Sequence, residues 1–251
     1  MNQLTNHNAL ITGANRGIGA GVALAFAAEG ASVAINYPNA SSAAEAMALC
    51  ADIESQGGHA ISIEADVTNP TAVESMIASV IDSFGHLDVL VNNAGIAHAA
   101  IVEDIEVEQW DSVIAVHLRG TFLACKYVLP HMYQRGSGRI INTTSQLAYL
   151  GAAGFAHYTA AKGAIVSFTR SLALEAAPRG IGVNAVAPGA TRTRMLENVP
   201  EEILEEIRSG IPRGQLADID DIVPSYVFLA SENSRHYIGQ VISPNGGDVF
   251  L

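Results

Sequence analysis

The stretch Ala9-Leu-Ile-Thr-Gly13-Ala-Asn-Arg-Gly17-Ile-Gly19 joins a short apolar run to a segment with a helical pattern. Residues 9–12 predict a buried strand, and residues 17–29 predict a helix that ends at Gly30. Glycines between a strand and a helix let the backbone turn tightly and approach a pyrophosphate, which the amide groups of the helix N-terminus then bind. The spacing is Gly-x-x-x-Gly-x-Gly rather than Gly-x-Gly-x-x-Gly, and we interpret it as a dinucleotide-binding loop.

The same alternation of strand and helix continues along the chain. Further strands are expected at 32–37, 59–64, 87–91, 139–143, 182–186 and 240–243, and further helices at 41–56, 71–84, 107–131 and 155–177. This order predicts an α/β fold of the Rossmann-like, doubly wound kind: a mainly parallel sheet of seven strands with helices on both faces. Without a repeat, a linker or a break in composition, we expect a single domain over residues 1–251.

One segment, residues 191–217, interrupts the alternation. It contains two prolines and an acidic run, which favour short helices in an excursion from the sheet. Such excursions form mobile lids over binding sites, and we expect a substrate lid here, with a plain surface loop as the alternative.

Composition excludes several classes of protein. Of 251 residues, 49% are hydrophobic and 15% are charged, and the net charge of −12 with no basic run disfavours nucleic acid and anionic membranes as partners. The two cysteines, Cys50 and Cys125, make no disulfide framework, and no cluster has metal-ligand spacing, so we expect no metal. The first eight residues are polar and no run reaches the ~18 apolar residues of a membrane span. We therefore expect a soluble, cytoplasmic protein.

The choice of nucleotide depends on the residue that reads the adenosine ribose, expected at the end of the second strand. The sequence there, Asn36-Tyr37-Pro-Asn-Ala-Ser-Ser, has no carboxylate to accept from the 2′-hydroxyl of NAD. Arg16 lies in the glycine loop, where its guanidinium could meet a 2′-phosphate. We favour NADP(H), with NAD(H) possible, and a solvated surface charge is the alternative for Arg16.

Tyr158 and Lys162 are the candidates for acid/base chemistry, because a spacing of four places both on one face of a helix. A phenol titrates near pKa ~10, and a neighbouring ammonium lowers that pKa, which would make a usable general acid/base. Ser145, thirteen residues upstream of Tyr158, could hydrogen-bond the same substrate oxygen. Taken alone, the tyrosine–lysine pair could also be an ordinary pair on a helix surface.

Together these motifs resemble the short-chain dehydrogenase/reductase family in its single-domain form, over nearly the whole chain. The resemblance implies hydride transfer between C4 of a nicotinamide and a carbonyl carbon, with Tyr158 moving the proton, Ser145 holding the oxygen and Lys162 holding the nicotinamide ribose. The matching catalytic residues are Ser145, Tyr158 and Lys162, and the cofactor-binding residues implied are Gly13, Asn15, Arg16, Gly17, Ile18, Gly19, Tyr37, Asp66, Val67, Asn93, Ala94, Gly95, Tyr158, Lys162, Pro188, Gly189, Thr191 and Thr193.

The substrate is expected to be a small-molecule carbonyl or alcohol. The pattern is closest to 3-oxoacyl thioester reductases and to sugar or secondary-alcohol dehydrogenases of the family. We favour an NADPH-dependent ketone or 3-oxoacyl reductase; an NAD-dependent sugar or secondary-alcohol dehydrogenase and a non-catalytic nucleotide-binding sensor remain alternatives. Candidate pocket walls are His98, Gln146, Tyr149, Phe155, His157, Met195 and Leu196.

The clearest departure from the family is His117, where asparagine is usual. In the family that asparagine is thought to fix a water that links the lysine to solvent. His117 either breaks this proton relay or replaces the amide, since an imidazole can donate from one nitrogen and accept at the other. We favour replacement, with an imidazole that could titrate near neutrality, and a purely structural histidine is the third reading.

The chain ends in the apolar residues Val249-Phe250-Leu251. Exposed apolar ends are often buried in a partner, and members of the resembled family are commonly tetramers with this region at an interface. We expect a homotetramer, with a dimer as the alternative.

Overall fold

Seven parallel strands form the central sheet, in the order β3-β2-β1-β4-β5-β6-β7. A computed structural model describes residues 2–196 and 199–250; Leu251, part of the apolar C-terminus noted above, lies outside them. The strands are β1 (Asn8–Ile11), β2 (Ser32–Tyr37), β3 (His59–Glu64), β4 (Val89–Asn92), β5 (Gly138–Thr143), β6 (Ile181–Val186) and β7 (Val241–Ile242). The predicted doubly wound α/β fold is confirmed.

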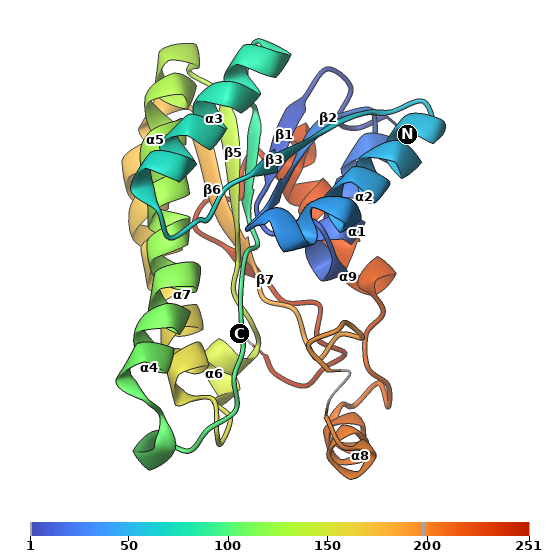
Figure 1. Ribbon diagram of the computed structural model, residues 1–251, viewed down its shortest axis with the longest axis vertical. Helices are drawn as coiled ribbons and strands as arrows, with labels where there is room; N and C mark the ends of the chain where they lie inside the picture. The colour runs from blue at the N-terminus through green and yellow to red at the C-terminus, as the bar shows by residue number, and fades with distance from the viewer. Residues whose placement is uncertain (1, 197–198, 251) are drawn as a thin grey trace.

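Helices cover both faces of the sheet (Figure 1). Neighbouring residues in β1 face opposite layers: Ile11 packs with the first helical layer, whereas Leu10 packs with the second. The first layer contains α1 (Gly17–Ala28), α2 (Ala43–Ser55) and α9 (Ile219–Ala230). The second contains α3 (Pro70–Phe84), α5 (Gly120–Arg135) and α7 (Ala156–Ala176).

The helix predicted over residues 107–131 is longer and irregular. It runs as α4 (Val107–Ile114), a π-helical turn (Ala115–Arg119) and α5, so that the helix continues to Arg135. By length and composition this helix could cross a membrane, but its inner face is buried against the sheet layer through residues such as Val128 and Met132. The π-helical turn contains His117, whose side chain is directed into the protein and is 1% exposed.

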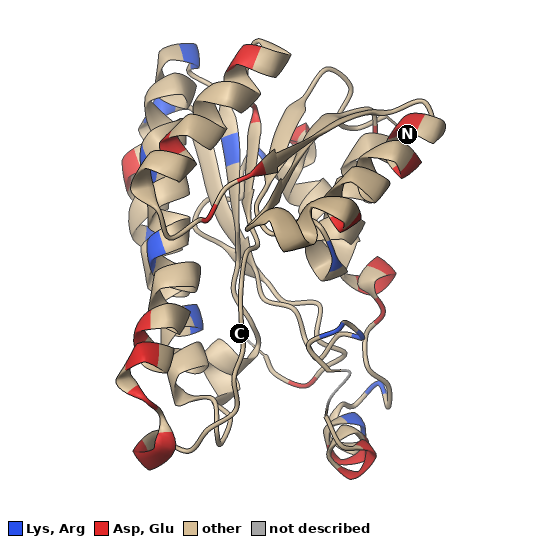
Figure 2. Ribbon diagram, in the orientation of Figure 1, with Lys and Arg blue, Asp and Glu red and all other residues tan. Residues whose placement is uncertain are grey.

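The region between β6 and β7 contains two helices, one within the segment where short helices were expected and one that was not assigned from the sequence. The segment 191–217 contains the helix α8 (Glu201–Gly210), whose charged side chains are mostly acidic, with Arg208 as the basic residue of its last turn (Figure 2). Helix α9 follows it and begins with a capping box formed by Asp218 and Asp221. Pro224 lies inside α9, and a proline at this point of the sequence suggests the end of a helix. The helix nevertheless continues, and Tyr226 just after the proline is completely buried.

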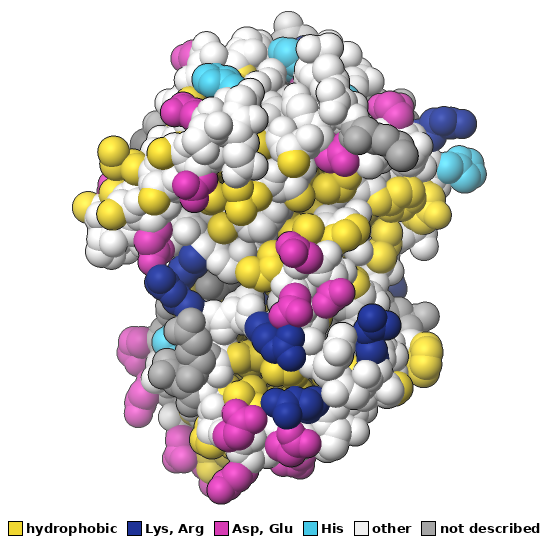
Figure 3. All heavy atoms as spheres, turned by 90° about the vertical axis from the view of Figure 1, so that its right-hand side faces the viewer, with side chains coloured by type: hydrophobic (Ala, Val, Ile, Leu, Met, Phe, Trp, Pro, Cys, Tyr) yellow, Lys and Arg dark blue, Asp and Glu magenta, His cyan; other side chains and the backbone are white. Residues whose placement is uncertain are grey.

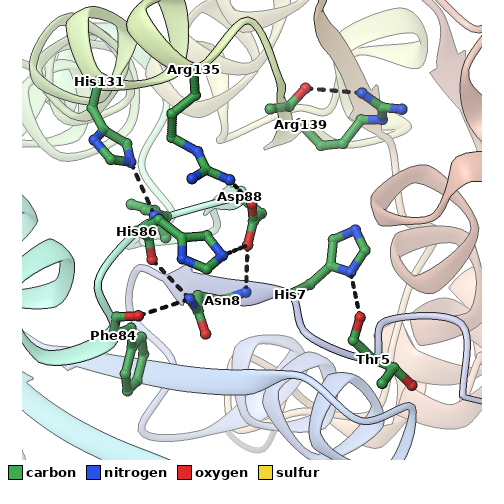
Figure 4. Close-up of polar contacts among 11 residues, drawn as sticks. Thr5, His7, Asn8, Phe84, His86, Asp88, His131, Arg135 and Arg139 are labelled. Carbon is green, nitrogen blue, oxygen red and sulfur yellow. Dashed lines mark hydrogen bonds and ion pairs between the residues drawn. The ribbon is translucent and has the colours of Figure 1, made fainter.

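The amino edge of the sheet is fixed by a polar cluster around Asp88 (Figure 4). The Asp88 carboxylate accepts hydrogen bonds from the Asn8 backbone at 2.8 Å and from the Arg135 guanidinium at 2.9 Å. His131 accepts a backbone hydrogen bond from Leu87 at 3.2 Å. These contacts join β1, the start of β4 and the end of α5, which leaves the opposite, carboxyl edge for ligands.

Candidate active site

The glycine loop lies at the carboxyl edge, where β1 and β4 are neighbours and the strand order reverses. Helix α1 begins at Gly17 (φ 60°) with no side-chain cap and no acidic residue in its first turn, so its N-terminal amides are available to an anion. A Cβ at Gly13 would lie 2.8 Å from the Ala94 Cα, and one at Gly19 would lie 2.5 Å from the Asn93 amide. Only glycine fits these positions, because the loop packs tightly on itself and on the turn after β4. The uncapped amides at the start of α1 are the feature that fits the pyrophosphate of a dinucleotide.

Asn93 and Ala94 join the end of β4 to this loop. The backbone N–H groups of both residues donate to the Thr12 hydroxyl, at 3.0 and 3.1 Å. The Asn93 side chain donates to the carbonyls of Thr12 and Gly13, at 3.0 and 3.1 Å. The predicted residues of the two turns are thus one hydrogen-bonded unit, and Gly95 follows directly with the His117 ring beneath it.

The residues expected around the adenosine lie at the ends of β2 and β3. Tyr37 ends β2, and its neighbour Asn36 accepts a hydrogen bond from the Gly13 backbone at 3.1 Å, which places this strand end beside the loop. Asp66 is exposed and accepts from the Thr68 backbone at 2.8 Å, while Val67 is 7% exposed.

The loop after β6 lies at the carboxyl edge of the sheet, and it extends from the turn after β5, at Gln146, to the glycine loop. The Pro188 carbonyl accepts from the Gln146 backbone at 3.1 Å, and the Gly189 N–H donates to Pro244 at 3.0 Å. Further along, Thr193 covers the start of α1: a Cβ at Gly17 would lie 3.8 Å from its methyl group. Thr191, which forms a parallel bridge to Ala217, holds the base of the predicted lid.

Ser145, Tyr158 and Lys162 come together where β5 ends against α7. Ser145 is 8% exposed, its hydroxyl accepts a hydrogen bond from the Leu147 backbone at 3.2 Å, and its proximity to Tyr158 partly offsets the rise that burial causes in the pKa of the phenol. The Lys162 Nζ lies 5.6 Å from the centre of the Tyr158 ring and donates to the Thr143 carbonyl at 2.7 Å. Thr144 donates to the Lys162 carbonyl at 2.8 Å and so fixes α7 to the strand.

The acid/base properties of this trio differ from the expectation. Burial raises the pKa of Tyr158, and the hydrogen bond from Ser145 opposes that rise only in part. Burial also lowers the pKa of Lys162 to about 7. The prediction that Lys162 lowers the tyrosine pKa is therefore wrong for this arrangement, because the buried ammonium is bound to a carbonyl and is itself easily deprotonated. Lys162 is the group that titrates near neutrality.

His117 lies beside the trio, with its ring edge-on to Tyr158 at a centroid distance of 5.3 Å. Its Nε2 is 2.7 Å from the Ile96 carbonyl and 3.0 Å from the Ile96 amide, so it hydrogen-bonds one or the other according to tautomer. Within the described residues its buried Nδ1 has no partner. Burial, with the charge of Lys162 next, lowers the His117 pKa to about 3. The expectation that His117 titrates near neutrality is therefore wrong, because its imidazole is already neutral there.

The low pKa of His117 predicts a pH-dependent stability. The unfolded chain protonates this histidine near its ordinary pKa of about 6.5, whereas the folded protein keeps it neutral down to about 3. Its contribution is therefore complete above 6.5 and is lost as the pH falls toward 3. For this group alone we expect a loss of roughly 2 kcal/mol of unfolding free energy at about pH 5.

Urea unfolding of the parent and of His117→Asn at two pH values measures this loss. The variant cannot protonate at this position, so its stability should fall less between about pH 7.5 and about pH 5, by the same roughly 2 kcal/mol. An identical fall in both proteins would contradict a buried, neutral His117.

The candidate pocket walls divide into two groups. Gln146 is 4% exposed and donates to Asp248 at 2.6 Å, and within the described residues its buried Oε1 has no partner. His157 is fully buried and its ring nitrogens have no described partner, so its assignment as a pocket wall is wrong. The remaining candidates are partly or fully exposed: His98, Tyr149, Phe155, Met195 and Leu196.

Two carboxylates at this edge were missed from sequence. Asp248 hydrogen-bonds Gln146 from 102 positions away, and Glu45 accepts a hydrogen bond from Asn15 of the glycine loop at 2.7 Å. Neither lies in a motif, and only the folded chain brings them to the site. Among the described residues, no group of three or more histidine, cysteine, aspartate or glutamate side chains could hold a metal ion.

A parallel sheet with a glycine loop at its switch point and a serine–tyrosine–lysine trio beside it defines an oxidoreductase that uses a nicotinamide dinucleotide. Residues 13–248 match the family model described as enoyl-(acyl carrier protein) reductase. The chain belongs to the short-chain dehydrogenase/reductase family, and it is an enzyme acting on carbonyl or hydroxyl groups.

Relatives of the chain match over its full length. It is 42% identical to a 3-oxoacyl-[acyl-carrier-protein] reductase of Synechocystis, covering 100% of both chains. It is also 40% identical to the (2S)-[(R)-hydroxy(phenyl)methyl]succinyl-CoA dehydrogenase subunit BbsD of Thauera aromatica, covering 97% of both chains. A solved structure from Beutenbergia cavernae, assigned as an NAD(P)-dependent gluconate 5-dehydrogenase with NADP bound at low occupancy, superimposes with a TM-score of 0.93 at 34% identity over 98% of both chains.

Proposed function

We propose that the protein is an NADPH-dependent reductase of ketones, with 3-oxoacyl thioesters as its substrate class. The proposal rests first on the contact of Tyr158 with Ser145 and Lys162 beside the glycine loop. Arg16 and the absence of a carboxylate at the end of β2 support NADPH, as does the NADP in the Beutenbergia structure. The 3-oxoacyl substrate is supported by the activity for which the Synechocystis relative is named.

Each residue of the trio has a role in reduction. The bound nicotinamide supplies the hydride to the carbonyl carbon. The Ser145 hydroxyl donates to the carbonyl oxygen and orients it, and the Tyr158 phenol donates the proton that this oxygen takes up. The raised pKa of Tyr158 leaves the phenol protonated at neutral pH, as proton donation requires, but also makes it a weaker acid. Lys162, with a pKa of about 7, can return a proton to the tyrosine between turnovers.

The remaining residues of the site support the cofactor. We propose that Gly13, Asn15, Gly17, Ile18 and Gly19 hold the pyrophosphate and its neighbouring ribose, since their loop leaves the α1 amides free. The other groups follow the family pattern. Arg16 and Tyr37 would contact the 2′ position of the adenosine ribose, and Asp66 and Val67 would contact the adenine. The nicotinamide half would be held by Asn93, Ala94 and Gly95 at the ribose and by Pro188, Gly189, Thr191 and Thr193 at the carboxamide. The chain acts as one domain with residues 191–217 as its lid, and we assign it to the cytoplasm.

One observation favours a second candidate, an NAD-dependent sugar or secondary-alcohol dehydrogenase. The polar pair Gln146 and Asp248 lies next to Ser145 and could read hydroxyl groups of a substrate, and one structural neighbour is assigned as a gluconate 5-dehydrogenase. A non-catalytic nucleotide sensor is disfavoured because Ser145, Tyr158 and Lys162 are all present and in contact.

A substrate panel separates these candidates. The protein is mixed with NADPH or NADH and with 3-oxoacyl thioesters, simple ketones and keto-sugars, and the loss of reduced-nicotinamide absorbance is followed; the reverse direction uses the matching alcohols. We expect the highest kcat/KM with NADPH and a 3-oxoacyl thioester. A higher kcat/KM for a polyol with NAD would replace the proposal by the second candidate.

We also propose a homotetramer. Phe250 at the C-terminus is 90% exposed, and a groove between α5 and α7 is lined by apolar side chains such as Phe122, Leu129 and Phe168. Lys126 and Glu175 lie in the same groove, so a second copy related by a twofold axis could pair these opposite charges. Light scattering at micromolar concentration should give about four times the chain mass of 26.2 kDa, and Phe122→Arg should lower it. A parent that scatters as a single chain would contradict the assembly.

A further inference from the structure

An ion pair joins the base of the lid to the helix after β2. The Arg194 guanidinium lies 2.5 Å from one oxygen of the Glu45 carboxylate, although the two residues are 149 positions apart. The other oxygen of Glu45 accepts the 2.7 Å hydrogen bond from Asn15 in the glycine loop. Glu45 therefore connects the lid to the loop expected to bind the dinucleotide.

Glu45 lies in a positively charged surrounding. Hydrogen bonds from Asn15 and Arg194 lower its pKa, and the charges of Arg194 and Arg16 add to that effect. Figure 3 shows basic and acidic side chains close together around an apolar area on this side of the molecule. Two arginines beside one carboxylate, Arg194 and Arg16, favour the binding of an anion even on a chain with a net charge of −12.

The Glu45 carboxylate lies close to the place where the adenosine ribose is expected to bind. In doubly wound folds the ribose lies between the glycine loop and the end of the second strand. Glu45 is in the first turn of α2, which follows β2, and it contacts the loop through Asn15. Its carboxylate therefore lies next to the place where the 2′ substituent of the ribose is expected, with Arg16 on the loop and Arg194 on the lid.

Arg194 can exchange Glu45 for another anion at a small cost in free energy. The Arg194 and Glu45 side chains are 57% and 32% exposed, and ion pairs this accessible to water add little stability. A 2′-phosphate has a larger charge than one carboxylate and offers several oxygens in a geometry that a guanidinium binds bidentately. Arg194 can thus leave Glu45 for a phosphate at small cost.

We infer that Arg194 binds the 2′-phosphate of NADPH together with Arg16, and that Glu45 is the counter-ion that Arg194 releases when the nucleotide binds. Arg194 is then a specificity-determining residue on the lid, and Glu45 is an internal competitor that reduces the affinity for NADPH. This inference rests on the proposed preference for NADPH.

Nucleotide titrations test the inference without any substrate. NADPH and NADH are titrated by fluorescence or calorimetry into the parent, Arg194→Gln and Glu45→Gln. Loss of a charge-assisted phosphate contact should weaken NADPH binding to Arg194→Gln by about tenfold, with little change for NADH. Glu45→Gln keeps an oxygen for Asn15 but removes the charge, so it should bind NADPH several-fold more tightly than the parent and NADH unchanged.

Arg192→Gln is the matched control. Arg192 is also a lid arginine in an exposed ion pair, with Asp218 at 2.7 Å, but its partner lies away from the glycine loop at the start of α9. Its NADPH affinity should stay within about twofold of the parent, and equal urea midpoints for all variants show that folding is intact.

The outcomes separate this inference from the proposed function. A parent that binds NADH at least as tightly as NADPH overturns the proposed cofactor. A parent that prefers NADPH, with Arg194→Gln no weaker than Arg192→Gln, overturns the role of Arg194 alone. If Arg194→Gln loses the same affinity for NADPH and for NADH, Arg194 binds the pyrophosphate that both nucleotides share. If Glu45→Gln binds NADPH more weakly than the parent, Glu45 does not compete with the phosphate. Either result contradicts the inference.

Discussion

Tyr158→Phe is expected to lower turnover by on the order of 10²-fold or more, which is a typical contribution of a positioned general acid. The substitution removes only the phenol oxygen, which Ser145 contacts. Without it, the carbonyl oxygen has no adjacent group from which to take a proton as the hydride arrives. Steady-state kcat with a saturating 3-oxoacyl thioester measures the effect.

Two controls distinguish chemistry from folding and binding. The NADPH dissociation constant and the urea midpoint of Tyr158→Phe should stay close to those of the parent, since the ring remains in place. Tyr237→Phe removes the same oxygen from a tyrosine that is 42% exposed and is not among the site residues, and it should leave turnover nearly unchanged. Near-parental turnover in Tyr158→Phe would show that another group supplies the proton.

His117→Leu is expected to give the second largest loss of turnover, about tenfold or more if the imidazole belongs to the proton relay. Leucine has a similar bulk but cannot hydrogen-bond Ile96, and it lacks the Nδ1 atom, which has no partner in the part of the chain that the structure describes. His117→Asn retains one donor and one acceptor and should remain active. Rates for both variants decide between the relay and a purely structural histidine.

The structure refines how His117 could act. With a pKa of about 3 the ring stays neutral at working pH, so it cannot store a proton and must pass hydrogen bonds. The ring also packs closely against Gly95, where an added Cβ would lie 2.5 Å from it, so only glycine fits beside the imidazole. Equal kcat in His117→Leu and the parent would mean that the ring only supports Gly95 and the π-helical turn around it.

The fold could be predicted largely because each strand and helix has its own local signal. Strands β2 and β3 occur at the predicted residues, since buried parallel strands appear as short apolar runs between turns. Helix α9 was missed because Pro224 interrupts its pattern, although its capping box at Asp218 was a readable signal. The π-helical turn of His117 has no sequence signal of comparable strength.

Contacts within the site could be predicted between residues that lie close together in the sequence. Contacts between residues far apart in the sequence could not. Tyr158 and Lys162 share one helix, whereas the contacts of Glu45 with Arg194 and of Gln146 with Asp248 depend on how distant loops meet. The pKa values of Tyr158 and Lys162 could not be predicted from the sequence for the same reason. Charge spacing suggested that a lysine would lower the tyrosine pKa, but burial dominates both groups once the helix packs on the sheet.

The central claim is hydride transfer from NADPH to a carbonyl, and an isotope label tests it most directly. The protein is incubated with NADPH that carries deuterium at C4 on either face and with a 3-oxoacyl thioester, and the product is analysed by mass spectrometry. We predict a 3-hydroxyacyl thioester with one deuterium on C3 from only one of the two labelled forms, and on the order of 10²-fold less of it with Tyr158→Phe in the same time. NADPH left unconsumed, or a product that gains no deuterium from either form, would contradict the account.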